Sequence, residues 1–257
     1  MRKLVAAGAM ALGIATLPLT AAHAGSTWIV TVKASDTTVN AGQKVTFTGT
    51  VKPHGAAAGE KVVLQERFEP GAKWKDQKKD KVNGRGKYSL SDRPSANTQH
   101  SYRVVLAATG KHAKGVSKTV KVTVYGWVGL TSLTNVNGDG MYFGPVDING
   151  KTYEDSVRSG WDDTTTSIEF NLGHRCDAMR ATFGLSDAST TSGQAELGVL
   201  SDGTSVYDQT FELEQTDKTT ISLDTPLKIK LTSTDSNVDS DIDGFGAFGN
   251  AQAHCTQ

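Results

Sequence analysis

Acidic residues near the carboxyl end of the chain have a spacing that suits a divalent cation. Asp239, Asp241 and Asp243 alternate with other residues and precede Gly244, which is the first half of a calcium-binding loop and offers hard oxygen ligands. The second half is missing, because the twelfth position is Asn250, where such a loop needs a bidentate glutamate. We favour a solvated acidic turn before the last strand. A structural calcium site of another geometry is the alternative.

The sequence shows no catalytic constellation. It has no Gly-x-Ser-x-Gly elbow, no His-Glu-x-x-His segment, no phosphate-cradling glycine loop and no Cys–His pairing. Carboxylate pairs are numerous because the second half of the chain is acidic, so two carboxylates alone do not indicate a glycosidase. We predict that the protein is not an enzyme and requires no cofactor.

The sequence contains only two cysteines, Cys176 and Cys255. In an exported chain an isolated pair is most economically a disulfide. Closing a loop of about 80 residues would constrain the unfolded chain by roughly 4 kcal/mol, and it would tie the C-terminus to the rest of the fold.

Residues 1–24 have the parts of a secretory signal: two basic residues, an apolar stretch over residues 4–19 and a small-residue end before Gly25. The alternative is a membrane anchor, but Pro18 interrupts the apolar stretch, which falls short of the ~20 residues that span a bilayer. Position 25 is not a cysteine, so a lipid-attached N-terminus is not indicated. We predict a secreted, extracellular protein without membrane insertion.

Charge divides the chain into two halves, although its formal net charge is zero. Residues 25–124 contain 18 Lys and Arg against 7 Asp and Glu, whereas residues 125–257 contain 7 against 20. This asymmetry predicts two domains, 25–125 and 126–257. We expect no nucleic-acid partner. Whether the opposite charges dock the two domains or join one copy to the next stays open.

Residues 27–125 contain about seven short runs in which every second residue is apolar, separated by turn residues such as those at 40–42 and 83–86. This pattern predicts an immunoglobulin-like β-sandwich. Segments 39–49 and 101–104 resemble bacterial immunoglobulin-like domains. The absence of cysteine from this half excludes the disulfide-pinned antibody type.

A basic run, residues 73–81, lies in the N-terminal half and includes Trp74. Clustered cations beside an aromatic side chain suit an anionic polymer. Alternation on a strand gives another interpretation, which we favour: Lys73, Lys75 and Lys79 lie on a solvated face and Trp74 points into the core.

From residue 127 the pattern is again all β, and four segments appear in a distinctive order. They are 149–153 (Asn-Gly-Lys-Thr-Tyr), 168–173 (Ile-Glu-Phe-Asn-Leu-Gly), 183–187 (Phe-Gly-Leu-Ser-Asp) and 197–204, which ends in Ser-Asp-Gly-Thr. In this order, over residues 147–253, the sequence resembles the NPCBM family of carbohydrate-binding modules, found beside glycosyl hydrolases including those of family 98. The resemblance implies a jelly-roll-like β-sandwich with a sugar-binding surface.

One segment departs from the family. Many members have a glycine-rich segment with a histidine after the leading tyrosine, whereas residues 154–161 read Glu-Asp-Ser-Val-Arg-Ser-Gly-Trp. This departure implies a sugar site that is altered, redirected to another glycan, or lost. A pyranose needs an aromatic platform and a few fixed polar groups. Our candidates are Trp161 first, beside Arg158, and then Tyr153, Tyr142 and Tyr207, each of which could instead be a packing residue.

The favoured function is that of a secreted, non-catalytic protein that binds an extracellular glycan through its second domain. The alternative is a protein-interaction or adhesion protein that binds a protein partner or an anionic cell-wall polymer by charge and has a vestigial sugar site. A hydrolase is a distant third hypothesis.

Overall fold

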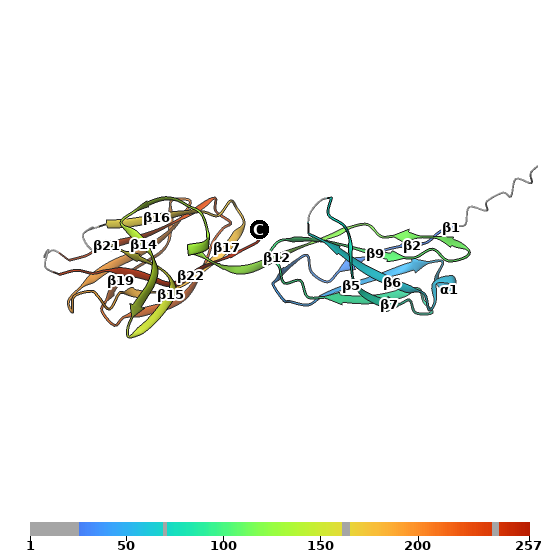
Figure 1. Ribbon diagram of the computed structural model, residues 1–257, viewed down its shortest axis with the longest axis horizontal. Helices are drawn as coiled ribbons and strands as arrows, with labels where there is room; N and C mark the ends of the chain where they lie inside the picture. Colours follow the sequence, from blue (N-terminus) through green and yellow to red (C-terminus); the bar gives the residue numbers. More distant parts are fainter. Residues whose placement is uncertain (1–25, 69–70, 161–164, 238–241) are drawn as a thin grey trace, which may run out of the picture.

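The computed structural model describes residues 26–68, 71–160, 165–237 and 242–257 (Figure 1). The predicted secretory signal, residues 1–24, lies outside them. Apart from helix α1 (His54–Ala57) and the 3-10 helix η1 (Leu130–Ser132), the regular elements of these residues are all β-strands. The strands form facing sheets around buried apolar side chains, which confirms the predicted all-β sandwich class.

The first hydrophobic core draws its buried side chains from between Trp28 and Val124. One sheet has the order β4 (Thr38–Asn40), β12 (Val120–Gly129), β9 (Gln99–Leu106), β6 (Lys61–Arg67), β7 (Lys75–Lys81), and β11 (Gly115–Val116) also pairs with β9. The other is built on β5 (Val45–Lys52), which pairs with β2 (Ile29–Val30), β3 (Lys33–Ala34) and β8 (Lys87–Asp92). A small ladder joins β1 (Ser26–Thr27) to β10 (His112–Ala113).

The second core draws its buried side chains from between Leu130 and Cys255. Its first sheet has the order β14 (Met141–Ile148), β15 (Lys151–Ser159), β22 (Gly246–Cys255), β17 (Cys176–Leu185), β20 (Thr216–Ser222). Its second has the order β13 (Asn135–Asp139), β16 (Thr165–Asn171), β21 (Lys228–Asp235), β18 (Gln194–Ser201), β19 (Thr204–Glu212). Phe183 and Phe248 are fully buried between these sheets, and the centroids of their rings are 5.4 Å apart.

Strand β12 connects the two sandwiches, which meet end to end (Figure 1). Its first part pairs with β9 and β4, and residues Gly126 to Gly129 pair with β22. At the same junction the amide of Gln257 donates to the carbonyl of Asn97 at 2.6 Å. The ring of His254 stacks on Tyr125 with the centroids 5.3 Å apart. The chain therefore crosses the junction within one strand, and the C-terminus returns to it.

The predicted disulfide is confirmed. Cys176 and Cys255 face each other across β17 and β22 and are bonded, 79 positions apart in the sequence. Because Cys255 also pairs with Gly126 of β12, the disulfide lies beside the junction. No helix within the described ranges is both long and apolar enough to cross a membrane.

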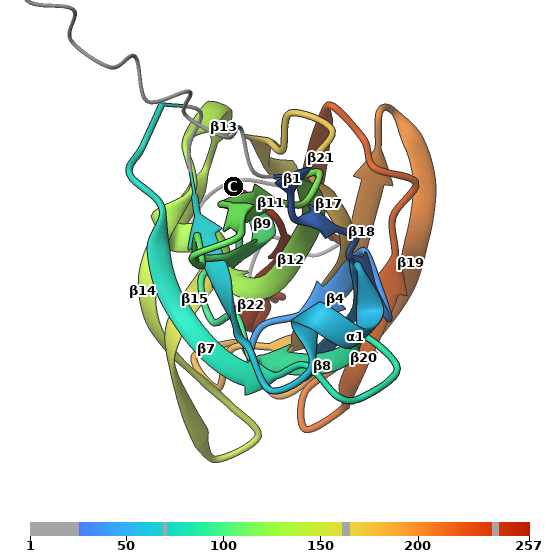
Figure 2. The same cartoon turned by 90° about the vertical axis from the view of Figure 1, so that its right-hand side faces the viewer.

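The basic run differs in part from expectation. Strand β7 is a largely exposed edge strand, visible near the margin of the end-on view in Figure 2, as a solvated strand should be. Trp74, however, is half-buried and is not part of the first hydrophobic core. The guanidinium carbons of Arg67 and Arg103 lie 4.5 and 4.2 Å from the centroid of its ring. The prediction of a core tryptophan was wrong because β7 begins only at Lys75 and a bulge in its pairing with β6 breaks the simple alternation.

Candidate functional site

A tight turn at the tip of the β14–β15 hairpin is the first part of the site. Asn149 and Gly150 join the strands with φ of 48° and 72°, the left-handed conformations that a two-residue hairpin turn requires. The carboxylate of Asp187 accepts a hydrogen bond from the amide of Gly150 at 2.8 Å, and the amide of Asp187 donates to the carbonyl of Asp147. Two segments that carry the family resemblance, 149–153 and 183–187, thus meet at this turn.

Two glycines let the hairpin lie on the outer face of the sheet. A Cβ on Gly249 would lie 2.7 Å from Cγ of Tyr153, and a Cβ on Gly184 would lie 2.8 Å from Cγ2 of Ile148. Both positions therefore require glycine for the hairpin to lie against the sheet as it does. Tyr153 and Ile148 form a small apolar cluster with Val146 and Ala247, separate from the main core.

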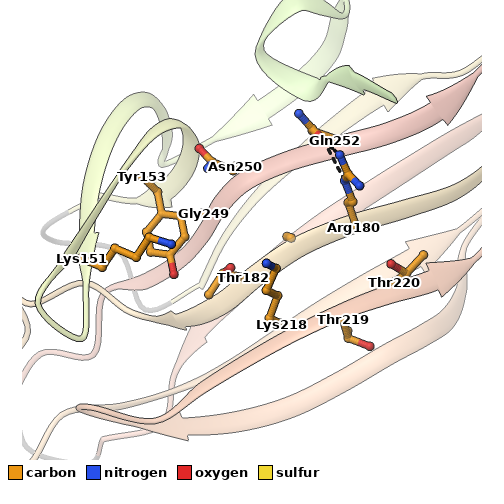
Figure 3. A pocket seen from close by; sticks show the side chains of 11 residues that line it. Lys151, Tyr153, Arg180, Thr182, Lys218, Thr219, Thr220, Gly249, Asn250 and Gln252 are labelled. Atoms are coloured by element: carbon orange, nitrogen blue, oxygen red, sulfur yellow. Dashed lines mark hydrogen bonds between the residues drawn. The ribbon is translucent and has the colours of Figure 1, made fainter. Parts of the chain in front are cut away.

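Beside this cluster the sheet is hollowed into a pocket of about 430 Å³, which we call the hairpin pocket (Figure 3). Its lining includes Lys151 and Tyr153 of β15, Arg180 and Thr182 of β17, Lys218 and Thr220 of β20, and Gly249, Asn250 and Gln252 of β22. Thr182 and Lys218 lie between the hairpin on one side and Arg180 with Gln252 on the other (Figure 3).

Several of these side chains are held in place. The Nε and Nη2 atoms of Arg180 both donate to Oε1 of Gln252, at 2.8 and 2.6 Å, and the guanidinium lies 4.1 Å from the ring centroid of Trp127 on β12. The ammonium of Lys151 lies 4.7 Å from the ring centroid of Tyr153. The pocket therefore presents oriented donors, hydroxyls and amides on a rigid sheet, which suits a polar ligand better than an apolar one.

A family comparison identifies the domain that contains this pocket. Residues 116–253 match the family described as NPCBM/NEW2 domain, and this stretch is more than half of the chain. The chain belongs to the NPCBM/NEW2 domain family. The predicted resemblance is confirmed, and the match begins upstream of residue 147, near the start of the strand that crosses the junction. NPCBM domains are carbohydrate-binding modules, not catalytic domains.

Solved structures similar to this chain include further carbohydrate-binding modules. One is the CBM51 from Clostridium perfringens GH95 in complex with methyl-galactose, at 15% identity and TM-score 0.42, covering 50% of this chain and 99% of that one. Another contains the CBM51-2 and INT domains of Clostridium perfringens ZmpB, at 10% identity and TM-score 0.42; the match covers 63% of this chain and only 38% of that one. No curated protein matches the sequence.

The NPCBM domain brings some of the predicted site residues together. Tyr153 lines the hairpin pocket, although only 9% of the residue is exposed. Tyr142 and Arg158 face each other across β14 and β15, with the guanidinium 5.9 Å from the ring centroid; Tyr142 is 55% exposed, and neither residue lines the pocket. Trp161, the first candidate, lies outside the described residues.

Tyr207 is half-buried and packs against the second core. Its ring stacks on Phe183 with the centroids 4.2 Å apart, and its hydroxyl donates to Asp217 at 2.9 Å. Burial and this hydrogen bond raise the pKa of the hydroxyl. These contacts explain the position of Tyr207 by packing, and it does not line the hairpin pocket.

The acidic run is only partly described. Asp239 and Asp241 lie outside the described residues, and Asp243 hydrogen-bonds Thr190 through its backbone. The preceding carboxylate, Asp235, accepts from the amides of Asn237 and Gly244. Within the part of the chain that is described, no three potential metal ligands gather. A structural calcium stays the alternative to the favoured solvated acidic turn.

Sequence reasoning missed Arg180, Thr182 and Lys218. They lie on β17 and β20, whose pairing places Lys218 opposite Thr182 and Thr220 opposite Arg180. The only sequence signal was the scarcity of basic residues in the acidic half, which makes Arg180 and Lys218 conspicuous, and no signal pointed to Thr182.

Proposed function

We propose that this is a secreted, non-catalytic protein that binds an extracellular glycan in the hairpin pocket of its NPCBM domain. One observation carries the proposal: in a domain of a carbohydrate-binding family, a hollow on a sheet face collects hydroxyl, amide and cationic side chains from four strands. Such fixed polar groups are what the hydroxyls of a saccharide need. The turn that closes one side belongs to the segments that define the resemblance.

A glycan array with the chain from Gly25 onward tests this, in calcium and in chelator. The site is tested with Thr220→Trp, which places a large ring over the pocket from an exposed strand position. Thr210→Trp is the matched control, because Thr210 is also an exposed strand threonine but lies on β19 of the other sheet. We expect selective glycan binding that Thr220→Trp abolishes and Thr210→Trp retains.

Other results would contradict the proposal in distinct ways. Binding that survives Thr220→Trp would move the glycan elsewhere, with the neighbourhood of Tyr142 and Arg158 as the next surface to test. A blank array from a folded protein would reduce the family membership to fold alone. Loss of binding in chelator would not contradict the proposal, and it would favour a calcium site over the solvated acidic turn.

In this proposal residues 25–125 form an immunoglobulin-like domain that presents the NPCBM domain, with the boundary at Tyr125 and Gly126 inside β12. Two facing sheets around a core without cysteine support this assignment. Export is supported by the sequence of residues 1–24 and by the disulfide, which persists in oxidising compartments.

Strand β7 favours a second candidate function. It is an edge strand with four exposed lysines, Lys75, Lys78, Lys79 and Lys81, on the basic half of the molecule. Such a strand could attract an anionic cell-wall polymer or an acidic protein, or its charges could simply prevent edge-to-edge pairing. Salt-sensitive retention on an anionic polymer that is lost when Lys78 and Lys79 become Gln would support the first interpretation. Unchanged retention would support the second.

A further inference from the structure

The hairpin pocket concentrates positive charge on an acidic domain. Residues 126–257 contain seven Lys and Arg against twenty Asp and Glu, yet Lys151, Arg180 and Lys218 all line this one hollow. They come from three different strands. Among the described residues none of the acidic side chains lines it.

Among the residues that the structure describes, no carboxylate forms an ion pair with these cations. Within the described part of the chain, Lys228 is the only Lys or Arg in an ion pair, with Glu169 on the other sheet. Arg180 is held instead by the neutral amide of Gln252, and these bonds use only two of its five N–H groups. An anionic ligand would supply the counter-charge that the lining of the pocket lacks.

The aromatic rings of the site are already covered. Lys151 lies over Tyr153, and Arg180 lies over Trp127. Tyr153 is also packed against Gly249 and Ile148, which leaves little of its ring for stacking on a sugar. What the pocket offers a saccharide is therefore charge and hydrogen bonds more than an open aromatic plane.

We propose that the hairpin pocket binds an anionic saccharide, whose carboxylate or sulfate group lies among Lys151, Arg180 and Lys218. Hydroxyls and amides at Thr182, Thr220 and Asn250 are placed to bind the neutral hydroxyls of the same sugar. This inference rests on the proposed glycan function and narrows its ligand class.

The test compares each neutral sugar with an acidic counterpart that differs from it at one substituent, by calorimetry on the chain from Gly25 onward. Galactose is compared with galacturonate, and N-acetylglucosamine with its 6-sulfate, so that the two pairs distinguish a carboxylate ligand from a sulfate ligand. We expect the acidic member of one pair to bind at least about tenfold more tightly, with an affinity that falls as salt screens the charges.

Lys218→Gln is the informative variant, because Lys218 is exposed and its replacement leaves the packing of Trp127 and Tyr153 intact. Lys230→Gln is the matched control, since it removes the same charge from the same domain on β21, outside the pocket. We expect the preference for the acidic sugar to disappear in the first variant and to persist in the second.

The outcomes separate the two proposals. If neutral and acidic sugars bind equally and Lys218→Gln changes nothing, the anionic inference is overturned while glycan binding stands. If Lys218→Gln and Lys230→Gln reduce the preference for the acidic sugar equally, that preference comes from the net charge of the domain and the anionic inference is overturned. If no saccharide binds, both proposals fall together.

Discussion

The guanidinium carbon of Arg180 lies 4.1 Å from the ring centroid of Trp127, and this contact links the strand that crosses the junction to the wall of the hairpin pocket. Trp127 also lies 4.9 Å from the ring of His254, whose Nδ1 is 2.6 Å from Asp177. One half-buried tryptophan thus supports both the junction and a pocket cation.

Replacing Trp127 with Ala should therefore weaken both. Loss of a partly exposed cation–π contact corresponds to about 0.5–1 kcal/mol, so we expect binding of an acidic sugar to weaken about two- to fivefold. Arg180 should keep its position, because Gln252 still accepts two of its hydrogen bonds. Calorimetry measures the effect, and Trp127→Phe, which keeps an aromatic face, should recover most of it. Equal losses in the two variants would argue against a role for the ring.

The glycine that seats the hairpin gives a second prediction. Gly249→Ala would place a Cβ 2.7 Å from Tyr153, so the hairpin must lift or the ring must move. Such overpacking typically costs about 1–3 kcal/mol. We expect lower thermal stability and a larger loss of glycan binding, because Tyr153 and Lys151 move with the hairpin.

Gly138→Ala is the control for this variant. It adds the same methyl group to a strand glycine, but its nearest neighbour would lie 3.5 Å away, at Ile168. Its melting temperature and binding should stay near those of the parent protein. Comparable losses in both variants would show that any added Cβ disturbs this domain, and the seating argument would fail.

The disulfide gives the third prediction. Removing it with Cys176→Ser and Cys255→Ser releases a loop of 79 positions, and we expect the free energy of unfolding of the NPCBM domain to fall by roughly 4 kcal/mol. Hydrogen exchange should rise in β17, β22 and the junction part of β12, while β5 and β6 stay protected. Reductant should destabilise the parent protein and leave the double variant unchanged. Uniformly raised exchange in both sandwiches would contradict this local role.

The sequence predicted those strands that have one buried face. Ile168 and Phe170 are buried and their neighbours are not, and this alternation located β16. It did not locate β14, where Tyr142 and Phe143 are both exposed and the register shifts between Gly144 and Val146. An edge strand with a bulge has no regular pattern to read.

The site was predictable only where local sequence determines local geometry. The Asn149-Gly150 turn is visible in the sequence because both residues tolerate positive φ. The pocket itself depends on the pairing of β17 with β20 and on the hairpin lying over Gly184 and Gly249. These are tertiary relationships between segments far apart in the chain, so no spacing rule could bring Lys218 to Lys151.

The fourth prediction concerns a buried ion pair in the N-terminal sandwich. His100 is 1% exposed, and its Nδ1 lies 2.6 Å from Oε1 of Glu66, which also accepts from the hydroxyl of Tyr102 at 2.7 Å. Burial alone would raise the pKa of Glu66, but the hydrogen bonds from His100 and Tyr102 lower it overall. Burial alone would lower the pKa of His100, but Glu66 and the carbonyl of Ala96 raise it overall.

The two shifts act at opposite ends of the pH range. The stability from Glu66 is fully present above its ordinary pKa of 4.5 and is lost as pH falls through its lower folded-state pKa. The stability from His100 is fully present below its ordinary pKa of 6.5 and is lost as pH rises through its higher folded-state pKa. The pair should therefore stabilise this sandwich most between pH 4.5 and pH 6.5, the ordinary pKa values of the two groups.

His100→Gln tests the prediction, because it removes the titrating group and leaves Glu66 buried. Breaking a buried pair typically costs about 3–5 kcal/mol, so we expect a loss of that order near pH 5.5 and a smaller loss above the raised pKa of His100, where the parent protein has itself lost the charge. Urea unfolding of the N-terminal sandwich across this range measures both. A constant difference between the two proteins at every pH would show that His100 stabilises the sandwich by packing and hydrogen bonding, without its charge.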